Sequence, residues 1–203
     1  MIALAGNFEI APMLFVPVGA LLTLAWLRLS RTPWREIGYV RPRSWARTIV
    51  LGVVLGALLK LAMKSIVMPL FGADPINRTY HYLAGNTAVL PLAVLGMLNA
   101  GWAEETTMRG FLFERLGKLL GSSVWARVAI VLITSAYFGL AHYATQGMTG
   151  VIQGAIMGLV YGTLYAATGQ LFLVMILHAS FDLMALAIIY AGWETRVAHW
   201  FFR

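Results

Sequence analysis

In the second half of this sequence, five carboxylate and imidazole side chains lie within or at the end of long apolar stretches. They are Glu104, Glu105, His142, His178 and Asp182. A charged group near the centre of a bilayer costs roughly 2.5–3.5 kcal/mol on the insertion scale, so a set of them needs a physical reason to persist. Carboxylates and imidazoles are also the side chains that most often transfer protons in catalysis. The set predicts an acid–base site inside a membrane, with a purely structural polar network as the alternative.

The spacing of these residues arranges them on helix faces. Glu105 and Arg109 are four residues apart, which lets the carboxylate and the guanidinium pair on one face. Glu104 points about 100° away from Glu105 and stays free for other chemistry. His178 and Asp182 have the same four-residue spacing, so this carboxylate can orient the imidazole. One carboxylate of the adjacent pair is therefore expected to be anchored and the other to be reactive.

Other hydrolytic chemistries lack their residues in this sequence. The chain has no Cys, which removes thiol nucleophiles and Cys-ligated zinc, and it has no HExxH zinc motif. Its only aspartates are Asp74, which falls in a loop, and Asp182, so they cannot form a membrane-embedded pair. The serines of segment 121–123 fall in a charged gap, and Ser180 faces a different side of its helix from His178. Glutamate and histidine chemistry remains.

The composition of the whole chain is that of a membrane protein. Of its 203 residues, 60% are hydrophobic and 11% are charged, and the mean hydropathy is +0.78. Soluble domains carry about 45–50% apolar and about 25% charged residues. We therefore expect an all-α, polytopic membrane helix bundle and exclude a soluble or disordered chain. About six transmembrane helices are expected, at 8–27, 48–71, 89–108, 127–145, 150–168 and 171–191.

One further helix completes the predicted organisation. Residues 110–120 alternate apolar and charged side chains at helical spacing, which predicts an interfacial amphipathic helix. No linker is long enough to separate domains. Residues 1–203 are therefore expected to form a single integral-membrane domain, with the motif-bearing core at 89–191.

A glycine stripe runs along the fifth apolar run. Its members are Gly150, Gly154, Gly158 and Gly162. Small residues at four-residue spacing let helix backbones approach closely. Internal packing is the favoured interpretation, with a dimer seam as the alternative, and the oligomeric state stays open.

Basic residues gather in the gaps between the apolar runs. The net charge is +7, and the gap 28–47 holds six arginines against Glu36, while the gap 109–127 is also basic. Both gaps are expected in the cytoplasm, with 72–88 and both chain ends outside. Met1–Glu9 lacks the basic segment of a cleaved signal peptide. Because the charges are confined to these gaps, the expected partner is the lipid bilayer and not a nucleic acid.

The expected depths of the ionisable residues disagree with one another. Counting about 1.5 Å per residue from the cytoplasmic boundaries places Glu104 and His178 about 10 Å into the membrane, but His142 about 22 Å. They meet only if the fourth helix starts below the lipid core, tilts or bends at Gly139. Because boundaries are the least certain part of such an interpretation, we expect the boundaries to be at fault.

Three ordered motifs connect these residues. They are EExxxR at 104–109, FxxxH at 138–142 and HxxxD at 178–182. On successive membrane helices, this trio resembles the CAAX protease and bacteriocin-processing (CPBP, or Abi) family of intramembrane proteases, a group related to the CAAX prenyl endopeptidases. The resemblance implies that Glu105 and Arg109 are a structural pair within the site.

The resemblance also implies roles for the other motif residues. Glu104 and His142 would activate a water for peptide hydrolysis, and His178 and Asp182 would stabilise the oxyanion or hold a metal. The sequence departs from the commonest family form at 106–108, where larger apolar residues are usual, and at Asp182, where Asn is frequent. Neither departure removes a catalytic group.

The expected function is that of an intramembrane endopeptidase that cleaves membrane-associated peptides or protein tails, in a prokaryotic plasma (inner) membrane. A water activated by glutamate is favoured slightly over zinc; a zinc ion would be held by Glu104, His142 and His178. One alternative is a proton-coupled transporter, although the polar motifs do not repeat between the two halves. The other is a catalytically idle scaffold. The natural substrate and its prenylation stay open.

Two lysines in the second run form a separate pair. Lys60 and Lys64 are four residues apart. Either both line the cavity and bind a substrate carboxylate, or Lys64 snorkels outward while Lys60 bonds to carbonyl groups. The second interpretation is favoured.

Overall fold

The computed structural model describes the backbone of residues 2–202 and the side chains of residues 15–202, and every regular element in this part of the chain is a helix. The predictions for Met1–Glu9 and for the first half of the run 8–27 concern side chains outside the described residues. The α-helices are α1 (Ile2–Leu29), α2 (Trp45–Ala62), α3 (Met68–Leu70), α4 (Leu90–Glu105), α5 (Phe113–Leu120), α6 (Val124–Ala141), α7 (Tyr143–Thr168), α8 (Leu171–Tyr190) and α9 (Glu194–Ala198).

Several helices are long and apolar enough to cross a membrane. The four described segments that meet this criterion are Trp45–Leu70, Val124–Ala141, Tyr143–Thr168 and Leu171–Tyr190. The described part of α1, Phe15–Leu29, is apolar but shorter, and α4 has 16 residues. These six segments correspond to the six predicted runs. The predicted all-α, polytopic membrane helix bundle is confirmed.

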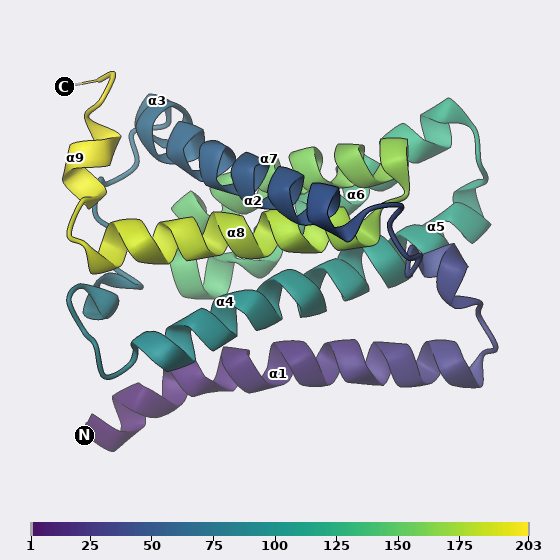
Figure 1. Cartoon of the computed structure of the whole chain (residues 1–203), viewed down its shortest axis with the longest axis horizontal. Helices are drawn as coiled ribbons and strands as arrows, with labels where there is room; N and C mark the ends of the chain where they lie inside the picture. Colours follow the sequence, from purple (N-terminus) through teal and green to yellow (C-terminus); the bar gives the residue numbers. More distant parts are fainter. Residues whose placement is uncertain (1, 203) are drawn as a thin grey trace.

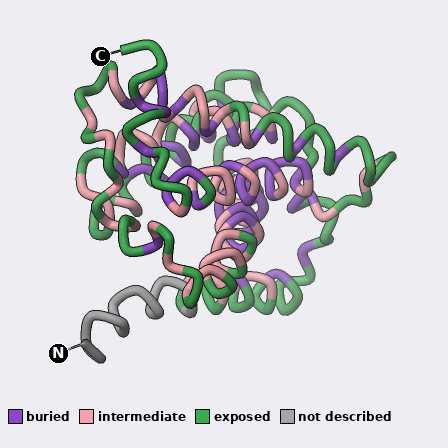
Figure 2. The backbone as a smooth tube through the Cα atoms, turned by 60° about the vertical axis from the view of Figure 1, so that its left-hand side comes forward, coloured by how far each residue is buried: buried purple, intermediate pink, exposed green. Residues whose placement is uncertain are grey.

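Helix α8 is the centre of the bundle. It packs against α2 and α4, and α1 lies along the outer side of α4 (Figure 1). Helices α6 and α7 pack against each other as a hairpin behind α8 (Figure 1). Figure 2 shows buried residues inside the bundle and exposed residues along its outer helices. Many of the exposed side chains are large and apolar, among them Leu22, Val54, Leu95 and Leu132, as expected for a surface that contacts lipid.

The glycine stripe of α7 packs inside the protein. A Cβ added at Gly158 would lie 2.8 Å from the Cα of Ser135 on α6, and one added at Gly154 would lie 3.1 Å from the Cα of Gly139. Such distances are shorter than normal carbon contacts, so the α6 and α7 backbones meet only because these positions lack side chains. The stripe therefore builds the α6–α7 hairpin, as the favoured interpretation expected.

Helix α4 continues into α5 through a π-helical segment, η4 (Thr106–Leu112). Such π segments inside α-helices are frequent at functional sites. The predicted amphipathic helix at 110–120 is helical throughout, but it is the end of this longer helix and not a separate element. Its position at the membrane interface stays a prediction.

Candidate active site

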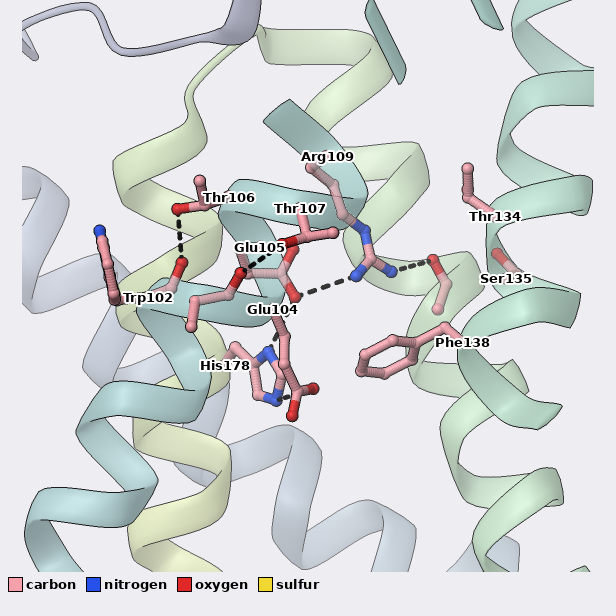
Figure 3. Close-up of polar contacts among 12 residues, drawn as sticks. Trp102, Glu104, Glu105, Thr106, Thr107, Arg109, Thr134, Ser135, Phe138 and His178 are labelled. Atoms are coloured by element: carbon pink, nitrogen blue, oxygen red, sulfur yellow. Dashed lines mark hydrogen bonds and ion pairs between the residues drawn. The ribbon is translucent and has the colours of Figure 1, made fainter. Parts of the chain in front are cut away.

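The last turn of α4 carries the two adjacent glutamates at the start of η4. Glu105 is fully buried, and its Oε1 accepts a hydrogen bond of 3.0 Å from Nη1 of Arg109. Arg109, also fully buried, donates from Nη2 to the backbone carbonyl of Gly158 on α7, at 3.0 Å. The predicted pair is thus present, and it ties α4 and η4 to the glycine stripe of α7. Glu104 points away from this pair and lies beside the ring of His178 (Figure 3).

His178 lies among three carboxylates. Its Nδ1 is 2.8 Å from Oε1 of Glu105, while its Nε2 is 3.4 Å from Oδ2 of Asp182 and 4.0 Å from Oε2 of Glu104. The sequence predicted that Asp182 orients this ring. The short contact instead comes from Glu105, because α4 packs across α8 at this level and the buried carboxylate reaches Nδ1. Asp182 and Glu104 both lie near the other ring nitrogen of His178, Nε2.

His142 occupies the junction between α6 and α7. Its Nδ1 is 2.7 Å from the carbonyl oxygen of Phe138 and therefore donates to it. In the neutral ring this hydrogen bond leaves Nε2 as the acceptor. The chain then bends at Gly147, whose φ of 61° and ψ of −155° are not helical. Glycine adopts such a φ readily, since it has no Cβ.

Four predicted site residues line one cavity of about 130 Å³. They are Glu104, His142, His178 and Asp182. The depth estimate that separated His142 from the others was wrong, because the helices do not begin at one level: α5 and the start of α6 extend beyond the first turn of α8 (Figure 1). The helix that carries Glu104 continues through η4 and α5 to Leu120, so Glu104 lies farther from the end of this continuous helix than the sequence suggested. It also faces a second cavity of about 170 Å³, which Val16 and Pro17 of α1 help to line.

Tyr161 is a cavity residue that the sequence did not reveal. Its side chain is fully buried, and its ring packs on that of His178 with centroids 4.9 Å apart. It lines the cavity with Glu104, and its hydroxyl group has no hydrogen-bond partner among the described residues. A tyrosine in an apolar helix is uncharged and does not stand out in the sequence. Its position in the cavity, against the ring of His178, therefore became visible only in the three-dimensional structure.

The favoured prediction was wrong for Lys64, whereas Lys60 does bond to a carbonyl oxygen, that of the Gln153 side chain. The side chain of Lys64 is 13% exposed and does not snorkel; its Nζ lies 3.7 Å from Oε1 of Glu194 and donates to the carbonyl of Pro75. Lys60 is buried, donates to the side-chain oxygen of Gln153 at 3.2 Å, and lines the cavity of Glu104. The loop 72–88 and α9 bring the partners of Lys64 to it, which local sequence cannot predict.

The family departures at 106–108 are part of a local hydrogen-bond chain. Thr106 and Thr107 each donate to the carbonyl four residues earlier, at 2.7 and 3.1 Å. Because the hydroxyl proton of Thr106 is donated to the carbonyl of Trp102, the Tyr39 hydroxyl must donate to Thr106 Oγ1, at 2.7 Å. The Tyr39 hydroxyl itself accepts a hydrogen bond from Nε1 of Trp102. Burial raises the pKa of Tyr39, which keeps this donor protonated. These bonds hold the start of η4, directly after the two glutamates.

The ionisable side chains do not form a metal-binding group. Among the described residues, no cluster of three or more His, Asp or Glu side chains has an arrangement that could hold a metal ion. The zinc set of Glu104, His142 and His178 therefore does not fit the geometry of the described residues.

Comparison with known proteins identifies the family. The family model described as type II CAAX prenyl endopeptidase Rce1-like matches residues 86–184, which include all three motifs. Searches of curated proteins and of solved structures gave no match. The matched segment runs from just before α4 almost to the end of α8, the part of the chain that builds the cavity. Residues 86–184 therefore carry a domain of the type II CAAX prenyl endopeptidase Rce1-like family, in agreement with the resemblance of the three motifs to the CAAX protease and bacteriocin-processing family.

Proposed function

We propose that this protein is an intramembrane endopeptidase in which Glu104, assisted by His142, activates a water in the 130 Å³ cavity. The observation that carries the proposal is the convergence of Glu104, His142, His178 and Asp182, from three different parts of the fold, on that one cavity. Membrane-embedded ionisable groups that converge in this way mark functional sites. The expected substrates are peptides or protein tails at the membrane.

Glu104 is the general base of this proposal. Its Oε2 accepts no hydrogen bond from the described residues, so this oxygen is left to take a proton from water. His142 presents Nε2 as a second acceptor, because Nδ1 is held by the carbonyl of Phe138. The water oxygen attacks the scissile carbonyl carbon while its proton passes to Glu104. The same proton then moves to the leaving amine as the carbon–nitrogen bond breaks.

His178 and Asp182 stabilise the tetrahedral intermediate. Glu105 fixes the ring of His178 through Nδ1, and Arg109 anchors Glu105 in turn. Such a chain of buried hydrogen bonds holds the ring without reorganisation during the reaction. Nε2 of His178 faces the cavity beside Asp182, at 3.4 Å. The developing oxyanion is expected to bind at this nitrogen in the form of the ring that carries a proton on both nitrogens, because Nδ1 already donates to Glu105.

A cleavage assay tests the proposal directly. Purified wild-type protein in lipid vesicles is incubated with a peptide library, and products are identified by mass spectrometry. Glu104→Gln, which keeps the size of the side chain, should reduce hydrolysis by about 100-fold or more. Glu36→Gln, which changes an exposed carboxylate paired with Lys118 far from the cavity, should retain full activity.

Two results would contradict the proposal. Wild-type activity in a correctly inserted Glu104→Gln protein would remove the general base. Hydrolysis that is lost on chelation and restored only by added zinc would show that the described arrangement of side chains changes to bind a metal.

A further inference from the structure

Lys60 is a buried cation in the middle of α2. Its side chain is 7% exposed, and the segment Trp45–Leu70 that carries it is one of the candidate membrane spans. Removing an ammonium group from water costs several kcal/mol unless an anion or several hydrogen bonds compensate. The position therefore calls for a partner.

The protein itself supplies little compensation. An ammonium group has three hydrogens to donate, and the hydrogen bond found for Nζ of Lys60 goes to Oε1 of Gln153. Nζ also lies 4.6 Å from the centre of the Phe181 ring. No carboxylate of the described residues lies within 4.0 Å of it, and Asp182 and Glu194 act on it only at longer range.

Lys64, one turn further along α2, provides an internal comparison. It has a carboxylate partner in Glu194, at 3.7 Å, and a carbonyl partner in Pro75. Glu194 is itself buried and also accepts from the backbone N–H of Asn77, at 2.7 Å. The described residues thus give Lys64 a carboxylate partner and give Lys60 none within 4.0 Å.

Lys60 lies where two cavities adjoin. One is the 130 Å³ cavity of Glu104, and the other is a cavity of about 210 Å³ beneath the loop 72–88 and α9. The uncharged amides of Asn77, Gln146 and Gln153 also line both cavities. An extended ligand that occupies both would pass Lys60 and could bond to these amides through its peptide groups.

We infer that Lys60 binds a carboxylate of the substrate and thereby fixes how far that carboxylate lies from the bond that is cut. The inference rests on the proposed function for the identity of the ligand as a peptide. A compact point charge on a flexible stem suits a single carboxylate and does not require the planar geometry that arginine recognises. The carboxylate can be the chain terminus or an acidic side chain. The competing role is purely structural, with Lys60 balancing the charge of Asp182.

A binding experiment tests the inference without any need for turnover. The probes are N-acetylated apolar tetrapeptides, prepared as the free acid, as the carboxamide, and as the carboxamide with an internal Glu or Gln. Thermal stabilisation of the full-length protein in detergent is measured at millimolar peptide. A carboxylate peptide should bind about 10- to 100-fold more tightly than its neutral counterpart. Preference for the free acid or for the internal Glu identifies the source of the carboxylate.

Variants of the two lysines complete the test. Lys60→Met should abolish the preference for the carboxylate peptide, Lys60→Arg should keep part of it, and Lys64→Gln should keep all of it. Equal binding of acid and neutral peptides by the wild type would overturn the inference, and so would an unchanged preference in Lys60→Met. If Lys60→Met does not fold, the carboxylate preference of the wild type and its partial loss in Lys60→Arg still test whether Lys60 binds the carboxylate.

Hydrolysis separates this inference from the proposed function. If Glu104→Gln abolishes cleavage while wild type cuts acid and amide peptides equally, only the role of Lys60 fails. If peptides bind with a carboxylate preference but Glu104→Gln remains active, only the mechanism of the proposed function fails. If the Lys60→Met variant is active, it should have a higher KM for carboxylate peptides and should cut them at several positions. A structural defect would instead lower kcat for carboxylate and neutral peptides alike, and it would lower the Tm of the protein.

Discussion

At the residue scale, the site depends on a division of labour between two adjacent glutamates. Glu105 is fully buried, and its Oε1 accepts hydrogen bonds from both Arg109 and His178. Glu104 keeps Oε2 free of hydrogen bonds and faces the cavity. Two neighbouring carboxylates of the same type thus have different environments, because α4 turns them about 100° apart.

The first prediction concerns the charge on Asp182. Glu105 already orients His178, so Asp182 is needed only for a hydrogen bond at the cavity side of the ring. Asp182→Asn should therefore retain most activity, whereas Asp182→Ala should lose it, since the polar groups it faces are left unpaired. Parallel kcat measurements on the two variants decide. Equal losses in both would show that the negative charge itself is required.

At the scale of elements, close backbone contact between helices brings the site residues together. Gly158 of α7 lies against Ser135 of α6, and its carbonyl accepts the hydrogen bond from Arg109. Arg109 lies within the π segment η4 and pairs with Glu105 at the end of α4, so one guanidinium connects α4, η4 and α7. The glycine stripe and η4 therefore act together as the support of the site.

The second prediction tests this support. Gly158→Ala places a Cβ 2.8 Å from the Cα of Ser135, so α6 and α7 must separate, at a cost of about 1–3 kcal/mol of unfolding free energy. Gly117→Ala on α5 is the matched control, since nothing lies within 4 Å of its added Cβ. The control should be neutral or more stable by about 0.5–1 kcal/mol, because Ala favours helix. Thermal unfolding in detergent measures the stability of both variants. If Gly158→Ala left the stability of the monomer unchanged but abolished a dimer of the protein, the glycine stripe would instead be a dimer seam.

At the scale of the whole molecule, the charged gaps segregate to the two ends of the bundle. The gap 28–47 and the α5–α6 turn lie at one end, and the loop 72–88 lies at the other with α9 and the C-terminus (Figure 1). This alternation agrees with the predicted topology. Which end faces the cytoplasm is still a prediction from the arginines of 28–47.

The third prediction decides this orientation. Because the sequence has no Cys, single cysteines can be introduced without background. Thr87→Cys and Ser122→Cys are both at exposed positions, the first in the loop 72–88 and the second in the α5–α6 turn. In intact cells a membrane-impermeant thiol reagent should label the cysteine at 87 but label the cysteine at 122 only after the inner face is opened. The reverse pattern would invert the topology.

The sequence by itself determined the class of the protein and predicted the residues that line one cavity. Apolar runs near 20 residues long leave helices as the structure that satisfies the backbone in lipid, so the bundle follows from hydropathy. The four-residue spacing of Glu105 and Arg109 fixed their pairing, because that separation returns side chains to one helix face. The three motifs likewise identified the family, which the match over 86–184 confirms.

Only the tertiary structure decided which groups meet. That Glu105, and not Asp182, makes the short contact to His178 depends on how α4 crosses α8, a relation between residues 73 positions apart. The buried hydroxyl of Tyr161, which has no hydrogen-bond partner within the described part of the chain, depends likewise on neighbouring helices. So do the unequal surroundings of Lys60 and Lys64. Local spacing fixes the direction of a side chain within its own helix, but the partner it finds depends on the level and angle at which separate helices pack.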